Sequence, residues 1–116
     1  MARLWRPDDR PATLAEARLL RRLLAHGLPR PVRQYEIRED GILVARPDFA
    51  YPERRVAVEY DSFRWHETRR AQAVTLARRN RLEGLGWHVL VATDADRRDG
   101  GAQLVRSLKR LVPRAE

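Results

Sequence analysis

The sequence contains no cysteine, one methionine and a single lysine, Lys109. Without cysteine the chain cannot form a disulfide scaffold, a thiolate zinc site or a cysteine nucleophile. No apolar run approaches the roughly 18 residues that a membrane span requires. Residues 1–12 are charged and contain prolines, so they do not resemble a secretory signal peptide. These absences favour a cytoplasmic protein.

The length and composition predict one ordinary globular domain. A chain of 116 residues suffices for one domain with a modest core. Hydrophobic residues make up 43% and there are 6 glycines and 7 prolines, which excludes collagen-like and wholly disordered chains. Residues 1–12 lack apolar periodicity and are interpreted as an N-terminal arm before a domain at residues 13–116. The chain could also end a longer protein with a further domain before it, and nothing indicates the oligomeric state.

Positive charge is abundant and unevenly placed. The chain has 24 basic and 16 acidic residues, a net charge of +8. All the basic residues except Lys109 are arginines, whose planar guanidinium suits phosphate oxygens. The densest stretch, residues 62–81, contains one acid, Glu67, and the arginines Arg64, Arg69, Arg70, Arg78, Arg79 and Arg81. A polyanion such as nucleic acid is the natural partner, although a solvated basic face would carry the same charge.

Local signals mark where the elements begin and end. Thr13 and Glu16 form a capping box before a leucine stripe, and Gly27 provides a left-handed stop. Asp40-Gly41 indicates a hairpin turn. Pro47 cannot donate to a strand ladder, so we expect an edge or a bulge there.

Hydrophobic periodicity predicts three helices and four strands. The predicted helices cover residues 14–26, 68–85 and 101–111, and the predicted strands cover 32–39, 42–49, 55–60 and 87–92. The first three strands should form an antiparallel meander, and the last is apolar enough to be central. The order αβββαβα predicts an α/β fold, a single-domain sandwich with a four-stranded mixed sheet flanked by helices.

Three acidic residues stand near the ends of adjacent predicted strands. Asp48 follows Pro47, and Glu59 and Asp61 close the next strand on the same face. Hairpin geometry can bring Asp48 beside Glu59, and clustered carboxylates attract a hard cation such as Mg²⁺ or Mn²⁺. Each acid alone is more simply a solvated strand-end residue, but the ordered set favours a metal site. Together with the following arginines it suggests phosphodiester hydrolysis, in which the metal lowers the pKa of a bound water.

These motifs resemble a known family. Pro47-Asp48, ten residues, then Glu59-x-Asp61 resembles the PD-(D/E)XK nuclease superfamily, which has the restriction-endonuclease-like fold. More closely, the run from Glu59 to His66 (EYDSFRWH), an arginine-rich helix and residues 85–90 (LGWHVL) are similar to bacterial domains of unknown function related to very-short-patch (Vsr) mismatch-repair endonucleases. The resemblance covers about residues 13–111 and implies a Mg²⁺-dependent DNA endonuclease or nickase.

The resemblance also implies residue roles. Asp48 and Glu59 match the metal-binding acids, and Glu16 matches an acid on the first helix near the metal-bound water. His66 matches a histidine that could act as general base or orient the water. Glu16 could equally serve only as part of the capping box, and His66 could be a surface residue before the second long helix.

Two positions depart from the superfamily pattern. Asp61 stands where the superfamily motif has lysine, although the closer relatives also have aspartate there. Arg78 falls where those relatives have an arginine facing the site, but Thr75 and Arg79 replace the acids that usually surround it. The alternatives are therefore a catalytically silent nucleic-acid-binding module of the same fold and, more remotely, a small arginine-rich protein-interaction domain.

Overall fold

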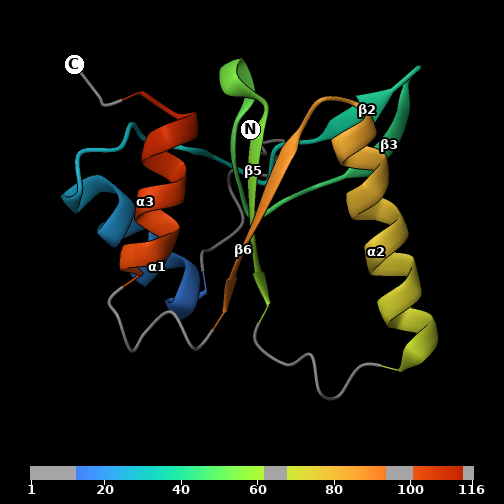
Figure 1. The fold of residues 1–116 in the computed structure, drawn as a ribbon, viewed down its shortest axis with the longest axis horizontal. Coiled ribbons are helices and arrows are strands. Elements are labelled where there is room, and N and C mark those ends of the chain that lie inside the picture. The colour runs from blue at the N-terminus through green and yellow to red at the C-terminus, as the bar shows by residue number, and fades with distance from the viewer. Residues whose placement is uncertain (1–12, 62–67, 94–100, 114–116) are drawn as a thin grey trace, which may run out of the picture.

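The computed structural model describes residues 13–61, 68–93 and 101–113, with Asp61 described by its backbone alone. Three α-helices and six strands lie in these ranges (Figure 1). In chain order the elements are α1 (Leu14–Ala25), β1 (Val32–Arg33), β2 (Ile37–Glu39), β3 (Ile42–Ala45), β4 (Phe49–Tyr51), the 3-10 helix η2 (Pro52–Arg54), β5 (Val56–Asp61), α2 (Arg69–Gly84), β6 (His88–Thr93) and α3 (Ala102–Leu111). The predicted α/β class is confirmed. The N-terminal arm expected at residues 1–12 lies outside the described ranges.

Four strands form one mixed sheet in the order β1-β4-β5-β6. The pairs β1–β4 and β4–β5 are antiparallel, whereas β6 runs parallel to β5, from Val56 opposite His88 to Asp61 opposite Thr93. The prediction that the last strand is central is wrong, because β6 lies at one edge of these four strands. Its apolar composition reflects burial of both faces, since Val89 packs in the core beneath α2 and Ala92 in the core on the opposite face.

The strands predicted at residues 32–39 and 42–49 are each interrupted, although their predicted antiparallel pairing is present as β1–β4 and β2–β3, and β4 pairs antiparallel with β5. Gln34 has a φ of 53° and ends the extended run between β1 and β2. Pro47 lies between β3 and β4, where it cannot donate a ladder hydrogen bond. Asp40 and Gly41 have φ values of 52° and 80°, which suit the predicted tight turn. As a result, β2 and β3 pair as a hairpin outside the four-stranded sheet.

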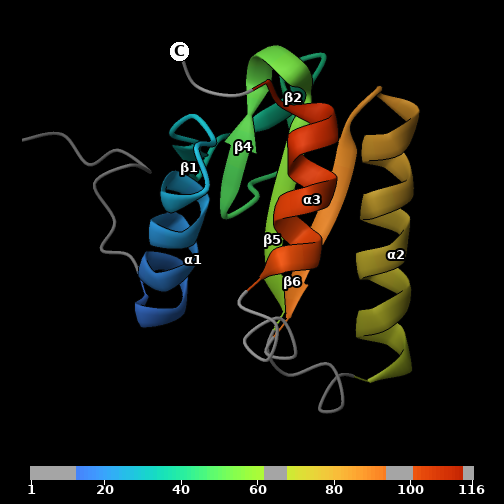
Figure 2. The ribbon, with the colours of Figure 1, turned by 60° about the vertical axis from the view of Figure 1, so that its left-hand side comes forward.

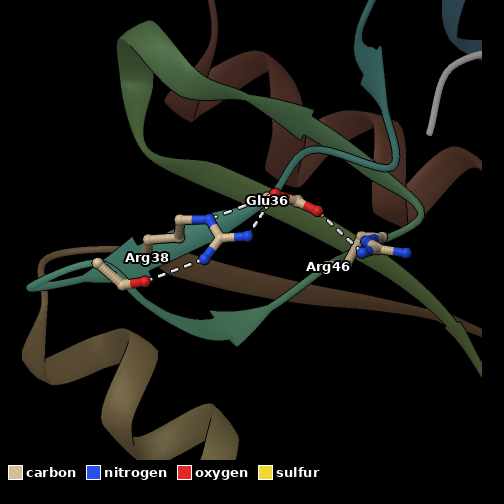
Figure 3. Close-up of polar contacts among 4 residues, drawn as sticks. Glu36, Arg38 and Arg46 are labelled. Atoms are coloured by element: carbon tan, nitrogen blue, oxygen red, sulfur yellow. Dashed lines mark hydrogen bonds and ion pairs between the residues drawn. The ribbon is translucent and has the colours of Figure 1, made fainter. Parts of the chain in front are cut away.

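The carboxylate of Glu36 bridges the guanidiniums of Arg38 and Arg46 in this hairpin region (Figure 3). Arg38 donates to Glu36 Oε2 from Nε and Nη2, at 3.3 and 2.9 Å. Arg46 Nη2 donates to Glu36 Oε1 at 2.9 Å, and Arg38 Nη1 donates to the Gly41 carbonyl at 3.0 Å. The hydrogen bond from Arg38, supported by Arg46, lowers the pKa of Glu36 below its ordinary value.

Separate cores lie on the two faces of the sheet. Helices α1 and α3 cover one face and α2 covers the other (Figures 1 and 2). The α1–α3 core includes the fully buried Leu23, Phe49 and Leu108, and the α2 core includes Leu82 and Trp87. Along β5, valines enter the first core and Ala57 enters the second, so the predicted alternation is confirmed. Glu59 follows the alternation towards α2.

Helix α2 is attached mainly through its C-terminal half. Thr68 caps it by accepting a hydrogen bond from the Ala71 amide at 3.1 Å. Of its apolar residues, Leu82 is buried, and the C-cap residue Leu85 is half-buried. Ala71 and Val74 are exposed, with Val74 65% accessible. Where the chain is described, none of its helices is long and apolar enough to cross a bilayer.

Candidate functional site

Asp48 immediately precedes β4, which pairs with the strand β5 that carries Glu59. Phe49 pairs with Val58 in the antiparallel β4–β5 ladder. Asp48 Oδ2 accepts a hydrogen bond from the Tyr60 amide at 2.7 Å. The Asp48 carbonyl accepts another from the Gln34 amide at 3.2 Å. These bonds fix Asp48 from both neighbouring strands.

Glu59 is a buried carboxylate, 7% exposed, on the α2 side of the sheet. Arg78 Nη2 donates to its Oε2 at 2.8 Å, and Arg79 Nη2 contacts the same oxygen at 3.5 Å. The other oxygen, Oε1, is buried and has no hydrogen-bond partner among the described atoms. Removing a carboxylate from water is costly unless it is paired, so the two guanidiniums stabilise Glu59 while one acceptor stays unused.

Glu16 approaches this region from α1. Its backbone amide donates to Thr13 Oγ1 at 3.1 Å, so the capping interaction is present. Its Oε2 lies 3.8 Å from Arg33 Nη2 on β1. Burial raises the pKa of Glu16, and the negative charge of Asp48 raises it further, against smaller opposing effects of Arg33 and Thr13. Glu16 therefore caps the helix and also lies within electrostatic reach of Asp48.

Two further predicted site residues cannot be placed as side chains. The backbone of Asp61 pairs with Thr93 at the end of β5, and its side chain lies outside the described part of the chain. His66 also lies outside that part. Within the ranges that are described, no three or more His, Cys, Asp or Glu side chains gather closely enough to hold a metal ion. Among the described acids, Asp48 contacts the backbone next to Glu59 through the Tyr60 amide and lies within electrostatic reach of Glu16.

The predicted phosphate-binding arginines divide into distinct environments. Arg69 and Arg70 are exposed at the start of α2. Arg78 and Arg79 contact Glu59, and Arg81 Nη2 donates to Glu39 Oε1 at 2.6 Å. Arg64 lies outside the described residues. The contact of Arg78 with Glu59 agrees with the arginine that the resemblance places facing the site. Sequence reasoning missed the pairing of Glu16 with Arg33, because it joins two elements whose packing no local motif specifies.

Comparisons with known proteins show that the chain is similar in sequence to segments of longer proteins. No protein-family model matches the chain, and no solved structure matches it. Uncharacterized proteins from the CDC 1551 / Oshkosh and H37Rv strains of Mycobacterium tuberculosis are each 38% identical to it over 100 residues, which is 83% of this chain. The chain spans only 36% of the length of these relatives. It is therefore similar to about a third of each mycobacterial protein.

Proposed function

We propose that the chain is a Mg²⁺- or Mn²⁺-dependent DNA endonuclease or nickase with a restriction-endonuclease-like fold, resembling the PD-(D/E)XK superfamily and its Vsr-related domains. One observation carries the proposal: Asp48, immediately before β4, is bonded to β5 through the Tyr60 amide next to Glu59, and Glu59 Oε1 is buried without a hydrogen-bond partner among the described residues. The order of the elements supports it, because β5 ends in the acidic motif and α2 then crosses to the parallel strand β6. This function places the protein in the cytoplasm with DNA as its partner.

The donor set fits a hard divalent cation. Carboxylate oxygens are the ligands that Mg²⁺ prefers, and it usually retains waters and substrate phosphate as well. Asp48 and Glu59 would hold the ion, and the partnerless Oε1 is an acceptor that a cation would satisfy. The bound ion would supply a water of lowered pKa and neutralise charge on the phosphate.

The remaining residues serve to position groups and to carry protons. The Tyr60 amide holds one oxygen of Asp48, which orients that carboxylate. Glu16, with its raised pKa, can exchange a proton near Asp48 closer to neutral pH than an ordinary glutamate. Arg69 and Arg70 are exposed and available to phosphates. Following the resemblance, His66 would orient the attacking water and Asp61 would support the metal-binding acids.

The test is nicking of supercoiled plasmid DNA with Mg²⁺ or Mn²⁺ by the wild type, Asp48→Ala and Asp48→Asn. We expect both variants to lose activity by about 100-fold or more, since metal-dependent chemistry contributes several kcal/mol. Asp40→Asn is the matched control, because it makes the same chemical change at an exposed turn whose φ of 52° asparagine tolerates. Equal nicking by the wild type and both Asp48 variants would rule out the assignment.

A second candidate, a catalytically silent nucleic-acid-binding module, has its own supporting observation. Arg78 and Arg79 already neutralise Glu59, so the carboxylate can be stable without a metal. Calorimetric titration with Mg²⁺ separates the two candidates. Heat of binding that disappears in Asp48→Asn supports the nuclease. Absence of such heat, together with DNA binding that weakens as salt increases, supports the silent module.

A further inference from the structure

A second concentration of positive charge lies on the face of the sheet opposite α2. Helices α1 and α3 both cover this face (Figures 1 and 2), and Leu19, Leu23, Leu104 and Leu108 enter their common core. The polar sides of the two helices carry six basic residues. We call this set the α1–α3 cationic face: Arg18, Arg21, Arg22, Arg106, Lys109 and Arg110.

The spacing of these residues places them on one side of each helix. Arg18, Arg21 and Arg22 occupy positions i, i+3 and i+4 of α1, and the three basic residues of α3 repeat the same spacing. All are exposed except Arg22, which is half-buried. Its Cδ and Nη1 lie 3.7 and 3.8 Å from the point that a Cβ on Gly101, the N-cap of α3, would occupy. Arg22 therefore lies beside the N-terminal end of α3.

The described part of the chain supplies no acidic partner for the charges of this face. None of the six basic side chains has an ion pair or a side-chain hydrogen bond with any other described residue. Glu16 is the only acidic residue in the two helices, and its side chain is 13% exposed and directed to Arg33. By contrast, three of the five arginines on α2 contact Glu59 or Glu39. Among the described residues, the basic side chains of α1 and α3 are therefore paired with acids less often than those of α2.

We propose that the α1–α3 cationic face binds the phosphate backbone of a nucleic acid duplex, independently of any metal and of cleavage. Guanidiniums match phosphate oxygens as planar forks, and five of the six residues are arginines. A lipid surface fits less well, because the apolar stripes of both helices are already buried against the sheet. The exposed apolar side chains of α1 are Leu14 and Leu24, one at each end of the helix, so they form no insertable patch.

The test measures binding of the full chain to a fluorescein-labelled DNA duplex by anisotropy, in EDTA, over about 50–200 mM salt. We expect Arg106→Gln/Arg110→Gln to raise the Kd by about tenfold or more. It should also reduce the slope of log affinity against log salt by about 2, since each phosphate contact contributes about 0.9. Arg106→Lys/Arg110→Lys keeps the charge and should keep the slope. Arg18→Gln/Arg21→Gln repeats the test on α1.

Arg55→Gln is the control away from this face, because Arg55 is exposed and donates to the Leu85 carbonyl at the end of α2, and we expect its Kd to stay within about twofold. An unchanged slope in both glutamine double variants would overturn the proposal. So would binding to anionic phospholipid vesicles without binding to the duplex. The outcome is independent of the nuclease proposal. If the wild type binds the duplex through this face but does not nick plasmid, only the nuclease proposal is rejected. If it nicks plasmid and the slope is unchanged in the variants, only the binding role of this face is rejected.

Discussion

The contact between Arg78 and Glu59 makes a quantitative prediction. Glu59 has a side chain 9% exposed, and Arg78 is its closest cation at 2.8 Å, with Arg79 at 3.5 Å. Arg78→Met keeps the aliphatic stem but removes the charge, which leaves the carboxylate with the more distant guanidinium alone. Because the buried charge is then poorly compensated, we expect the variant to be less stable than the wild type.

The magnitude follows from the exposure of the two partners. Removing one partner of a fully buried ion pair costs about 3–5 kcal/mol. The Arg78 side chain is 38% exposed and Arg79 remains, so solvent screening reduces the expected cost to about 1–2 kcal/mol. A chain of this length has an unfolding entropy of about 240 cal/mol/K, so Tm should fall by about 4–8 °C. Circular dichroism melts at pH 7 without divalent cations measure this shift.

A double-mutant cycle makes the reasoning refutable. In a Glu59→Gln background no buried charge remains, so Arg78→Met should cost less than about 0.5 kcal/mol. Arg69→Met, at an exposed position of the same helix, is the matched control and should change stability by no more than about 0.5 kcal/mol. An equal loss in both Glu59 backgrounds would show that the stem of Arg78, rather than its charge, provides the stability.

The same variant reports on the metal proposal. If Arg78 and Mg²⁺ compete for Glu59, the ion should raise the Tm of Arg78→Met more than that of the wild type, because binding to the folded state alone stabilises it. If Mg²⁺ does not change the Tm of either protein, Glu59 is not a metal ligand and serves only as a structural partner of α2.

Three further predictions concern other contacts. Burial, with a smaller contribution from Asp48, raises the folded-state pKa of Glu16 above 4.5. The folded state therefore favours the protonated form of Glu16. The resulting stabilisation is full below pH 4.5 and is lost as pH rises through the raised pKa. Differential scanning fluorimetry should show Glu16→Gln about 1–3 °C more stable than the wild type at pH 7 and equal at pH 4, whereas a lower Tm at pH 7 would contradict the assigned cause. Arg38 lowers the pKa of Glu36, so the ionised Glu36 stabilises the folded state above pH 4.5, and this stabilisation is lost as pH falls through the lowered pKa. The midpoint of urea unfolding of Glu36→Gln should therefore lie below that of the wild type at pH 7 and equal it in acid. Leu82→Ala should cost about 2–5 kcal/mol in urea unfolding because Leu82 is fully buried, and Val74→Ala, at a 65% exposed position, should cost no more than about 0.5 kcal/mol; similar losses would show that α2 packs differently.

Features set by neighbouring residues were predictable from the sequence. Gly27 and Asp40-Gly41 take the positive φ values that their residue types indicate, and Thr13 caps α1 as its motif predicts. Alternation along β5 and the antiparallel pairing of β4 with β5 were also predictable, and they bring Asp48 next to β5, where it accepts a hydrogen bond from the Tyr60 amide. Each of these inferences depends on backbone geometry over a few residues.

Features set by tertiary packing were not predictable. Gln34 takes a left-handed conformation that its residue type does not favour, so the break between β1 and β2 had no local signal. The edge position of β6 depends on the order of strands in the sheet, which apolar composition does not determine. The direction of the Arg78 side chain depends on how α2 lies across the sheet. Arg78, predicted to bind phosphate, therefore donates a hydrogen bond to Glu59 instead.

The one-sided attachment of α2 distinguishes the two ends of the helix. Leu82 and the Arg78–Glu59 contact anchor the C-terminal half, while Arg69 lies about 14 Å further along the axis at 1.5 Å per residue. The two exposed arginines at positions 69 and 70 therefore lie at the end of α2 that contributes no buried side chain among the described residues, about two and a half helical turns from the nearest contact with Glu59.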